Sequence, residues 1–244
     1  MPSTDTTGAA ATGAAAAPAA TRVRRRNNRR GEGVRLAEEL LKAADGLIGE
    51  YGDTGRLSLR AVAARAGVAT TSVYLHFADI TALKGALAQR SVAEFAAVCD
   101  AAVTGINDPA QALIVRCQAY ARHALEHASR YRLMFDAELT QQHSHADCAA
   151  EGPVSAGRGD LSPAPFGALV ESLFVCRQAG LVPADRSIER LAVLIWTALH
   201  GQIILRLDRP RFPWPGLDGM ITELVTRLAR LPTGAAAPQP GLET

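Results

Sequence analysis

A short segment of the chain, GVATTSVYLHF (67–77), gathers side chains that can form hydrogen bonds. These groups are the hydroxyls and the imidazole of Thr70, Thr71, Ser72, Tyr74 and His76. Hydroxyls on a short helix can bind phosphate oxygens or base edges, and a threonine methyl can contact the methyl group of thymine. Taken singly, each hydroxyl could be a solvated surface group, and the tyrosine could pack between helices. The whole set in one segment favours contact with a nucleic acid.

Two helices are expected to hold this segment in place. Apolar residues recur at helical spacing over 34–51, and Ser58 can cap a second helix that ends at Gly67. Glycine suits the left-handed conformation that closes a helix. A short third helix over 70–76 follows, anchored to the core by Val73. Two helices joined by a short glycine-containing turn are typical of a helix-turn-helix.

The rest of the chain is also expected to be helical. Asp79 can cap a fourth helix, and Asp108 followed by a proline can start a fifth. No strand-like alternation persists, so the predicted fold class is all-α. A three-helix helix-turn-helix domain is expected to precede a larger helical domain. The predicted boundaries are a disordered arm at 1–33, the helix-turn-helix domain at 34–80, the larger domain at 81–231 and a disordered tail at 232–244.

The composition is that of a chain with a large apolar content and little net charge. Its 244 residues are 48% hydrophobic and 20% charged, and the formal net charge is +2. This is enough apolar material for one domain, or for a small domain joined to a larger one. The four cysteines are far apart in the sequence, which favours free thiols in a reducing cytosol.

Several classes of protein are disfavoured by missing sequence features. No apolar run approaches the roughly 20 residues of a membrane span, and the arginines near the N-terminus are not followed by the apolar region of a signal peptide. The motifs GxSxG, HExxH, the P-loop and a GxGxxG after a strand are all missing. We therefore expect a cytoplasmic protein that is not an enzyme, uses no cofactor and does not bind a membrane.

The sequence resembles the tetracycline-repressor (TetR/AcrR) family of transcription regulators. Residues 34–87 are similar to its N-terminal DNA-binding domain through SLRAVAARAGVATTSVYLHF, followed by an acid and TAL. The back half is similar to its ligand-binding and dimerisation domains through RYRLMF (130–135), LHGQIILRL (199–207) and FPWP (212–215). The resemblance implies a two-fold dimer with one recognition helix per subunit in the major groove of a palindromic operator. It also implies a small molecule that binds the larger domain and changes the spacing of the two heads.

The resemblance assigns roles to individual residues of the helix-turn-helix. Tyr74 and His76 match positions that contact the DNA backbone, and Arg60 matches one that reaches base edges or phosphate. Ile80 replaces a lysine that is usual in the family, and Lys84 one turn later is its expected substitute. Together with the hydroxyls and an arginine-rich arm, the predicted DNA-binding residues are Arg60, Thr70, Thr71, Ser72, Tyr74, His76, Lys84, Arg24, Arg25 and Arg26.

The arm is included because the predicted head is not basic. Residues 36–80 contain four basic and six acidic side chains, whereas residues 21–35 contain seven arginines and one acid. Affinity for DNA depends heavily on neutralising phosphates. We hypothesise that the arginines of 22–30 supply this charge, as the arms of homeodomains do in the minor groove. The alternative is a solvated basic tail without a specific role.

Aromatic and polar residues of the larger domain predict a ligand site. A mostly apolar cavity with a few polar groups is the usual design for a small-molecule site, although residues at helical spacing also form ordinary core. The predicted ligand-binding residues are Arg116, Tyr120, Tyr131, Phe135, Phe174, Trp196 and His200. Apolar faces on the last two helices suit a dimer interface, with packing inside one chain as the alternative. The predicted interface residues are Trp196, Gly201, Ile204, Leu217, Met220, Ile221 and Leu224.

Two groups of histidines have spacings that can bind zinc. His123 and His127 lie one turn apart on an expected helix, without an evident third ligand nearby. HSHADC contains His143, His145 and Cys148 in an expected loop. We predict a physiological metal site at neither.

These features together predict a ligand-responsive transcriptional regulator. It is expected to be a repressor that binds a palindromic operator as a dimer and is released by a small molecule, which shifts the population of conformers. Its expected partners are double-stranded DNA, an unidentified small-molecule effector and a second copy of the chain. Two alternatives stay open: an all-α small-molecule-binding protein or enzyme without DNA function, and a helical adaptor whose basic arm binds another polyanion such as membrane lipid.

Overall fold

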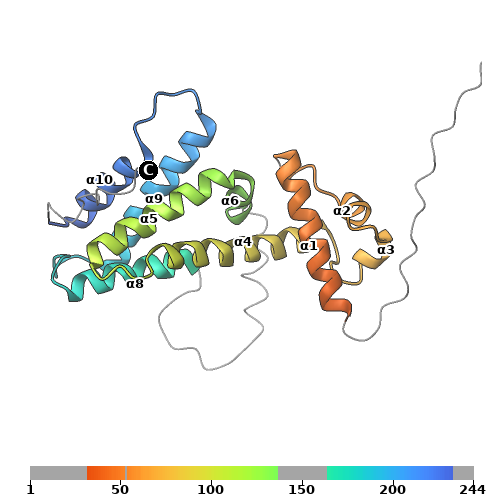
Figure 1. Cartoon of the computed structure of the whole chain (residues 1–244), viewed down its shortest axis with the longest axis horizontal. Coiled ribbons are helices and arrows are strands. Elements are labelled where there is room, and N and C mark those ends of the chain that lie inside the picture. Colours follow the sequence, from red (N-terminus) through yellow and green to blue (C-terminus); the bar gives the residue numbers. More distant parts are fainter. Residues whose placement is uncertain (1–31, 53, 137–163, 233–244) are drawn as a thin grey trace, which may run out of the picture.

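The computed structural model describes residues 32–52, 54–136 and 164–232. Within these residues every regular element is a helix, as the sequence predicts. The helices form a small head and a larger body at opposite ends of an elongated molecule (Figure 1). The arginine-rich arm, the HSHADC segment and the C-terminal tail lie outside the described residues.

The head consists of three helices, α1 (Glu32–Tyr51), α2 (Leu59–Ala66) and α3 (Thr70–Val73). Helix α1 begins two residues before the predicted start of the domain, so the end of the predicted arm belongs to this helix. The head has its own core, to which all three helices and the start of the next helix contribute. Its fully buried members include Leu40, Ile48, Val62, Val73 and Leu83.

Helix α4 (Ile80–Ala102) joins the head to the body (Figure 1). The Asp79 carboxylate accepts a hydrogen bond from the Ala82 amide at 2.7 Å and caps the helix as predicted. Its first turns place Leu83 and Leu87 in the core of the head, whereas Phe95 further along lies in the core of the body. The predicted domain boundary at 80/81 therefore falls at the start of one continuous helix that belongs to both cores.

The body consists of α5 (Pro109–Glu126), α6 (Ala128–Met134), α8 (Ala164–Gln178), α9 (Ile188–Asp208) and α10 (Leu217–Ala229), packed with the second half of α4. The Asp108 side chain caps α5 and Pro109 occupies its first turn, as predicted. Helix α6 is short and packs against both α4 and α1, so it lies where the body meets the head.

Helix α9 is long and apolar enough by length and composition to cross a membrane, alone among the described helices. Ile195, Leu199 and Ile203 on one of its faces are buried in the body core. The core helix of a helical bundle has this composition because it is covered by its neighbours. Other apolar side chains of the helix, Val193, Leu194 and Leu205, are exposed.

Candidate nucleic-acid interface and ligand cavity

The turn between α2 and α3 is closed by local hydrogen bonds that the sequence specifies. Gly67 adopts φ 69°, ψ 29°, the left-handed conformation predicted for it, and its amide bonds the carbonyls of Ala63 and Ala64. The Val68 amide bonds the Ala63 carbonyl at 3.0 Å. At the other end of α2, the Ser58 hydroxyl caps the helix by accepting from the Ala61 amide at 3.2 Å. These bonds fix the direction in which α3 leaves the turn.

The 70–77 segment has one buried side and one exposed side. Val73 is fully buried and Phe77 is 8% exposed, so both anchor the segment to the head core. Thr71 is exposed and Tyr74 is 57% exposed. The three other predicted members, Thr70, Ser72 and His76, are half-buried. The segment thus presents a hydroxyl and a phenol at the outer end of the head.

The outer surface of the segment also carries an apolar residue that sequence reasoning missed. Leu75 lies beside Tyr74 and is 81% exposed. A leucine this exposed makes little contact with its own chain, so it is available to a partner. The sequence did not predict this exposure, because the apolar type of a side chain does not show whether a neighbouring helix covers it.

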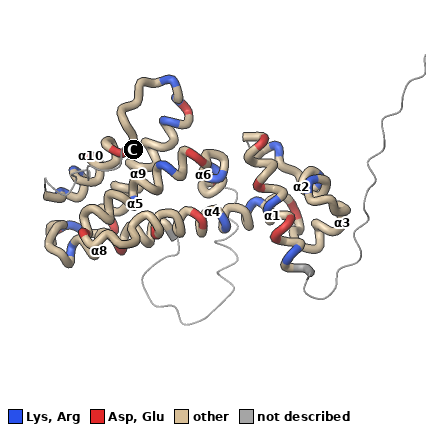
Figure 2. Tube along the Cα trace, in the orientation of Figure 1, with Lys and Arg blue, Asp and Glu red and all other residues tan. Residues whose placement is uncertain are grey.

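The charged residues of the head lie mainly outside α3. Figure 2 shows α3 without a charged residue, in contrast to α1. Arg60 is exposed in the first turn of α2, and Lys84 is half-buried in the second turn of α4. Arg65 forms an ion pair with Glu50 at 2.6 Å. The described head therefore offers few cations near α3, in agreement with the charge count from the sequence.

A small cavity lies in the body between α4, α5, α8 and α9. It is narrow and partly open to solvent, with room for about one water molecule, and is lined by Cys99, Arg116, Cys117, Tyr120, Pro165, Leu169, Trp196 and Leu199. Three residues predicted to bind ligand, Arg116, Tyr120 and Trp196, are among them. Burial raises the pKa of Cys99 to about 11 and that of Cys117 to about 12, so both thiols are neutral and add to an apolar wall.

Arg116 is the charged group of this cavity. One guanidinium nitrogen pairs with Asp100 at 2.6 Å, and the side chain is only 14% exposed. Its Nε atom is buried and has no hydrogen-bond partner in the described structure. A buried donor without a partner costs free energy.

The other predicted ligand residues form an aromatic cluster next to the cavity. The Tyr131 hydroxyl and the His200 Nδ1 atom are 2.8 Å apart, and burial lowers the pKa of His200. Phe135 packs against His200 with ring centroids 4.7 Å apart, and against Trp196 at 6.0 Å. Trp196 thereby links the cluster to the cavity wall. Phe174 does not line this cavity and is 45% exposed on α8.

An exposed apolar face runs along α8 and α9. Its members are between 40% and 53% exposed and comprise Phe174, Val175, Val193, Leu194 and Leu205. Gly201 lies at helical spacing between Thr197 and Leu205 on the same helix. Sequence reasoning looked for this face on the last two helices and missed α8, because period alone does not show which apolar side a neighbouring helix covers.

Residues of α10 were predicted to belong to the dimer interface, but the structure packs several of them inside their own chain. Ile221 is fully buried in the core of its own chain and has no surface to offer a partner. Leu217 and Leu224 are partly buried against the same core. Polar bonds also tie α10 to α5: Gln118 bonds Thr222 at 3.0 Å, and Arg122 pairs with Asp218 at 3.0 Å. Packing inside one chain therefore explains much of the apolar pattern of α10.

An ion-pair cluster connects the head to the body. Arg130 on α6 pairs with Asp45 on α1 through two nitrogens, and with Glu94 on α4 at 2.9 Å. Arg90 joins the cluster by pairing with Glu94 at 3.0 Å and with Glu38 at 3.2 Å. Sequence reasoning did not find this cluster, because its partners are far apart in the chain and helical period does not pair them.

Three potential metal ligands lie at the end of α5. His123, Glu126 and His127 place their ligand atoms within 4.8 Å of one another, so the pair of histidines does have a third potential metal ligand. The expectation that no such ligand lies nearby is therefore wrong. The other candidate group, His143, His145 and Cys148, lies outside the described residues.

Comparison with known proteins finds the same two-part organisation. Residues 40–87 match the family described as "Bacterial regulatory proteins, tetR family", and residues 113–230 match "Tetracyclin repressor-like, C-terminal domain". A comparison with curated proteins gave no match.

Solved structures share this fold along most of the chain. A protein of unknown function from Rhodococcus sp. RHA1 is 26% identical with a TM-score of 0.62, covering 80% of this chain and 94% of that one. The fatty acid degradation regulator FadR from Bacillus halodurans is 14% identical with a TM-score of 0.60, covering 83% and 97%. SmeT, the repressor of the Stenotrophomonas maltophilia multidrug efflux pump SmeDEF, is 17% identical with a TM-score of 0.57, covering 85% and 96%.

Proposed function

Because the chain belongs to the TetR family of bacterial regulatory proteins, we propose that it is a repressor that binds a palindromic operator as a dimer and leaves it when a small molecule binds. The observation that carries the proposal is the exposed side of the 70–77 segment. Val73 and Phe77 anchor this segment to the head core, and the α2–α3 turn fixes its direction. The proposal gives the chain no catalytic role.

Different exposed side chains are proposed to make different contacts with DNA. The Thr71 hydroxyl and the Tyr74 phenol are suited to phosphate oxygens or base edges, and the exposed Leu75 side chain is suited to a thymine methyl. Arg60 on α2 and Lys84 on α4 flank the segment and supply phosphate contacts. Hydroxyl and apolar contacts of this kind select a sequence, whereas the cations mainly add affinity.

The cavity lined by Arg116, Tyr120 and Trp196 is the proposed effector site. Its wall is mostly apolar, and the unpartnered Nε of Arg116 favours an effector with a hydrogen-bond acceptor. The effector is therefore a small, largely apolar molecule with at least one acceptor group. Expansion of this narrow cavity on binding would displace α4, which continues directly into the head.

The apolar face on α8 and α9 is the proposed dimer interface. Exposed apolar side chains on two helices that pack against each other are what a helix-on-helix dimer buries. Gly201 and the half-buried Ile204 lie on or beside this face and retain their predicted role. Dimerisation through the body would present two heads to two operator half-sites, and palindromic DNA matches such a two-fold arrangement.

A binding assay on the DNA upstream of the chain's own coding sequence tests the proposal. Fluorescence anisotropy with wild type, Thr71→Ala and Tyr74→Ala measures the contribution of the exposed segment. Each substitution removes one exposed polar group, and we expect affinity to fall about tenfold, since a good contact is worth about 1–3 kcal/mol. Thr104→Ala is the matched control, because it removes an exposed hydroxyl from the body.

The outcomes separate this proposal from the alternatives. Weaker binding by both head variants and unchanged binding by Thr104→Ala support it. Equal binding by all four proteins would show that the 70–77 segment does not read DNA. Absence of binding by the wild type at low salt would favour a small-molecule-binding protein without DNA function.

A further inference from the structure

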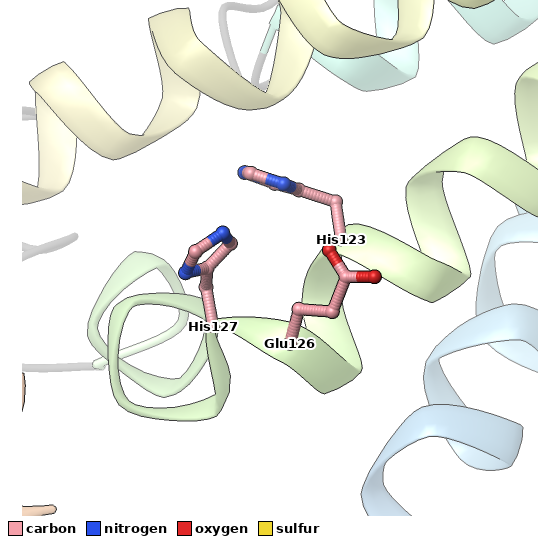
Figure 3. A group of neighbouring side chains, drawn as sticks. All are labelled: His123, Glu126 and His127. Atoms are coloured by element: carbon pink, nitrogen blue, oxygen red, sulfur yellow. The ribbon is translucent and has the colours of Figure 1, made fainter.

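The end of α5 carries three potential metal ligands on one side of the helix. His123, Glu126 and His127 come from a single turn, and their ligand atoms lie within 4.8 Å of one another. Figure 3 shows both imidazole rings directed toward α4, with the Glu126 carboxylate beside them. The two ring centroids are 4.3 Å apart.

The backbone and the core hold the two histidines close together. The His127 amide donates to the His123 carbonyl at 3.0 Å, and the His127 carbonyl accepts from the Tyr131 amide at 2.9 Å. The His123 ring packs edge-on against Phe95 with centroids 4.4 Å apart. The pair is therefore positioned by the α5–α6 junction and by the core, before any ligand is present.

The His123 ring has an unused polar atom. Its Nε2 atom is buried and has no hydrogen-bond partner in the described structure. A neutral imidazole has a free lone pair, which is the form that binds a metal ion.

We propose that His123, Glu126 and His127 form a binding site for one divalent transition metal ion of the zinc type. Two imidazoles and one carboxylate suit zinc, cobalt, nickel and copper, whereas magnesium and calcium prefer oxygen ligands. Ligands of one zinc ion lie about 3–3.5 Å apart, since each bond is about 2.0–2.2 Å long. Small rotations of Glu126 and His127 would close the present spacing, and a fourth position would stay open to water.

Isothermal titration calorimetry of the full chain with zinc chloride tests this site. The wild type is expected to bind one zinc ion per chain at this position. His123→Ala and His127→Ala should each weaken that binding about tenfold or more, since each removes one of three protein ligands. Glu126→Gln should weaken it less, because the amide oxygen is a neutral ligand.

The matched control is the double variant His143→Ala/His145→Ala, which removes the other histidine pair with zinc-like spacing. It should retain the binding that the His123→Ala/His127→Ala variant loses. The reverse pattern, or no zinc binding by the wild type, would overturn the proposal. Circular dichroism checks the fold of each variant. If the His123→Ala or His127→Ala variants unfold, anomalous scattering from zinc-soaked crystals of the wild type tests the site directly. A zinc ion between His123 and His127 supports the proposal, and the absence of an ion there overturns it.

This proposal does not depend on DNA binding. The titration measures the metal alone, so a failed operator assay would leave it standing, and a failed titration would leave the proposed regulator standing.

Discussion

Gly67 is the residue at which the local sequence most directly determines the geometry of the candidate DNA-binding segment. Its φ of 69° is in the left-handed region, which side chains with a Cβ atom adopt only at a cost. A Cβ atom built here meets nothing within 4 Å, so no steric clash adds to that cost. Any effect of substitution therefore comes from the backbone.

Gly67→Ala is expected to lower the free energy of unfolding by about 1–2 kcal/mol, the usual cost of a left-handed residue with a side chain. Gly49→Ala is the matched control, because Gly49 is exposed in helix α1 and a Cβ atom there also meets nothing within 4 Å. That control should raise stability by about 0.5–1 kcal/mol, since alanine favours helix. Urea denaturation measures both, and equal effects would contradict the assigned role of Gly67.

Single residues also mark the limit of prediction from sequence. The caps Ser58, Asp79 and Asp108 were predicted, because a capping side chain acts within three residues of its own position. The exposure of Leu75 and the burial of Ile221 were not, because each depends on which neighbouring helix covers the side chain. Helix caps depend on neighbouring residues in the sequence, whereas the burial of a side chain depends on how distant segments pack around it.

At the scale of elements, α4 and α6 connect the head to the body. Helix α4 contributes to both cores, and α6 places Arg130 between α1 and α4. The sequence predicted most of the helices, since their apolar periods and caps are local signals. It did not predict that α6 would hold the two parts together, because an ion pair between residues 45 and 130 has no periodic signature.

A double-mutant cycle on Arg130 and Asp45 measures this connection. Their side chains are 28% and 31% exposed, and Arg130 bonds Asp45 through two nitrogens. We expect a coupling free energy of about 1 kcal/mol or more in urea denaturation, because the pair is partly shielded from water. The control cycle uses Arg227 and Glu223, whose side chains are 77% and 55% exposed and which should couple by less than about 0.5 kcal/mol. Similar coupling in both cycles would argue against a structural link at α6.

At the scale of the whole molecule, the apolar face on α8 and α9 predicts self-association. Leu194→Glu places a charge on this face, where Leu194 is 40% exposed. Burying that charge in an interface is costly, so the variant is expected to sediment as a monomer at concentrations where the wild type is a dimer. Leu75→Glu changes an apolar residue that is 81% exposed on the head and should leave the dimer intact. If the Leu194→Glu variant is still a dimer, the dimer interface does not lie on this face.

The arginine-rich arm is expected to add positive charge for DNA binding, since the described head offers few cations near α3. Deletion of residues 1–30 is expected to weaken operator binding and to flatten its dependence on salt. The slope of log affinity against log salt should fall by about 0.9 for each DNA phosphate that the arm neutralises. Measurements of affinity at several salt concentrations give this slope, and an unchanged slope would mean that the arm does not bind DNA.

The central claim is that two copies of the 70–77 segment read two half-sites of one operator. Footprinting of the wild type on the DNA upstream of its coding sequence tests this most directly. We predict two protected half-sites related by two-fold symmetry, with centres about 10 base pairs or a multiple apart. At the lowest concentration at which the wild type protects both half-sites, Tyr74→Ala is expected to protect neither. A single unpaired protected region, or protection that Tyr74→Ala leaves unchanged, would contradict the claim.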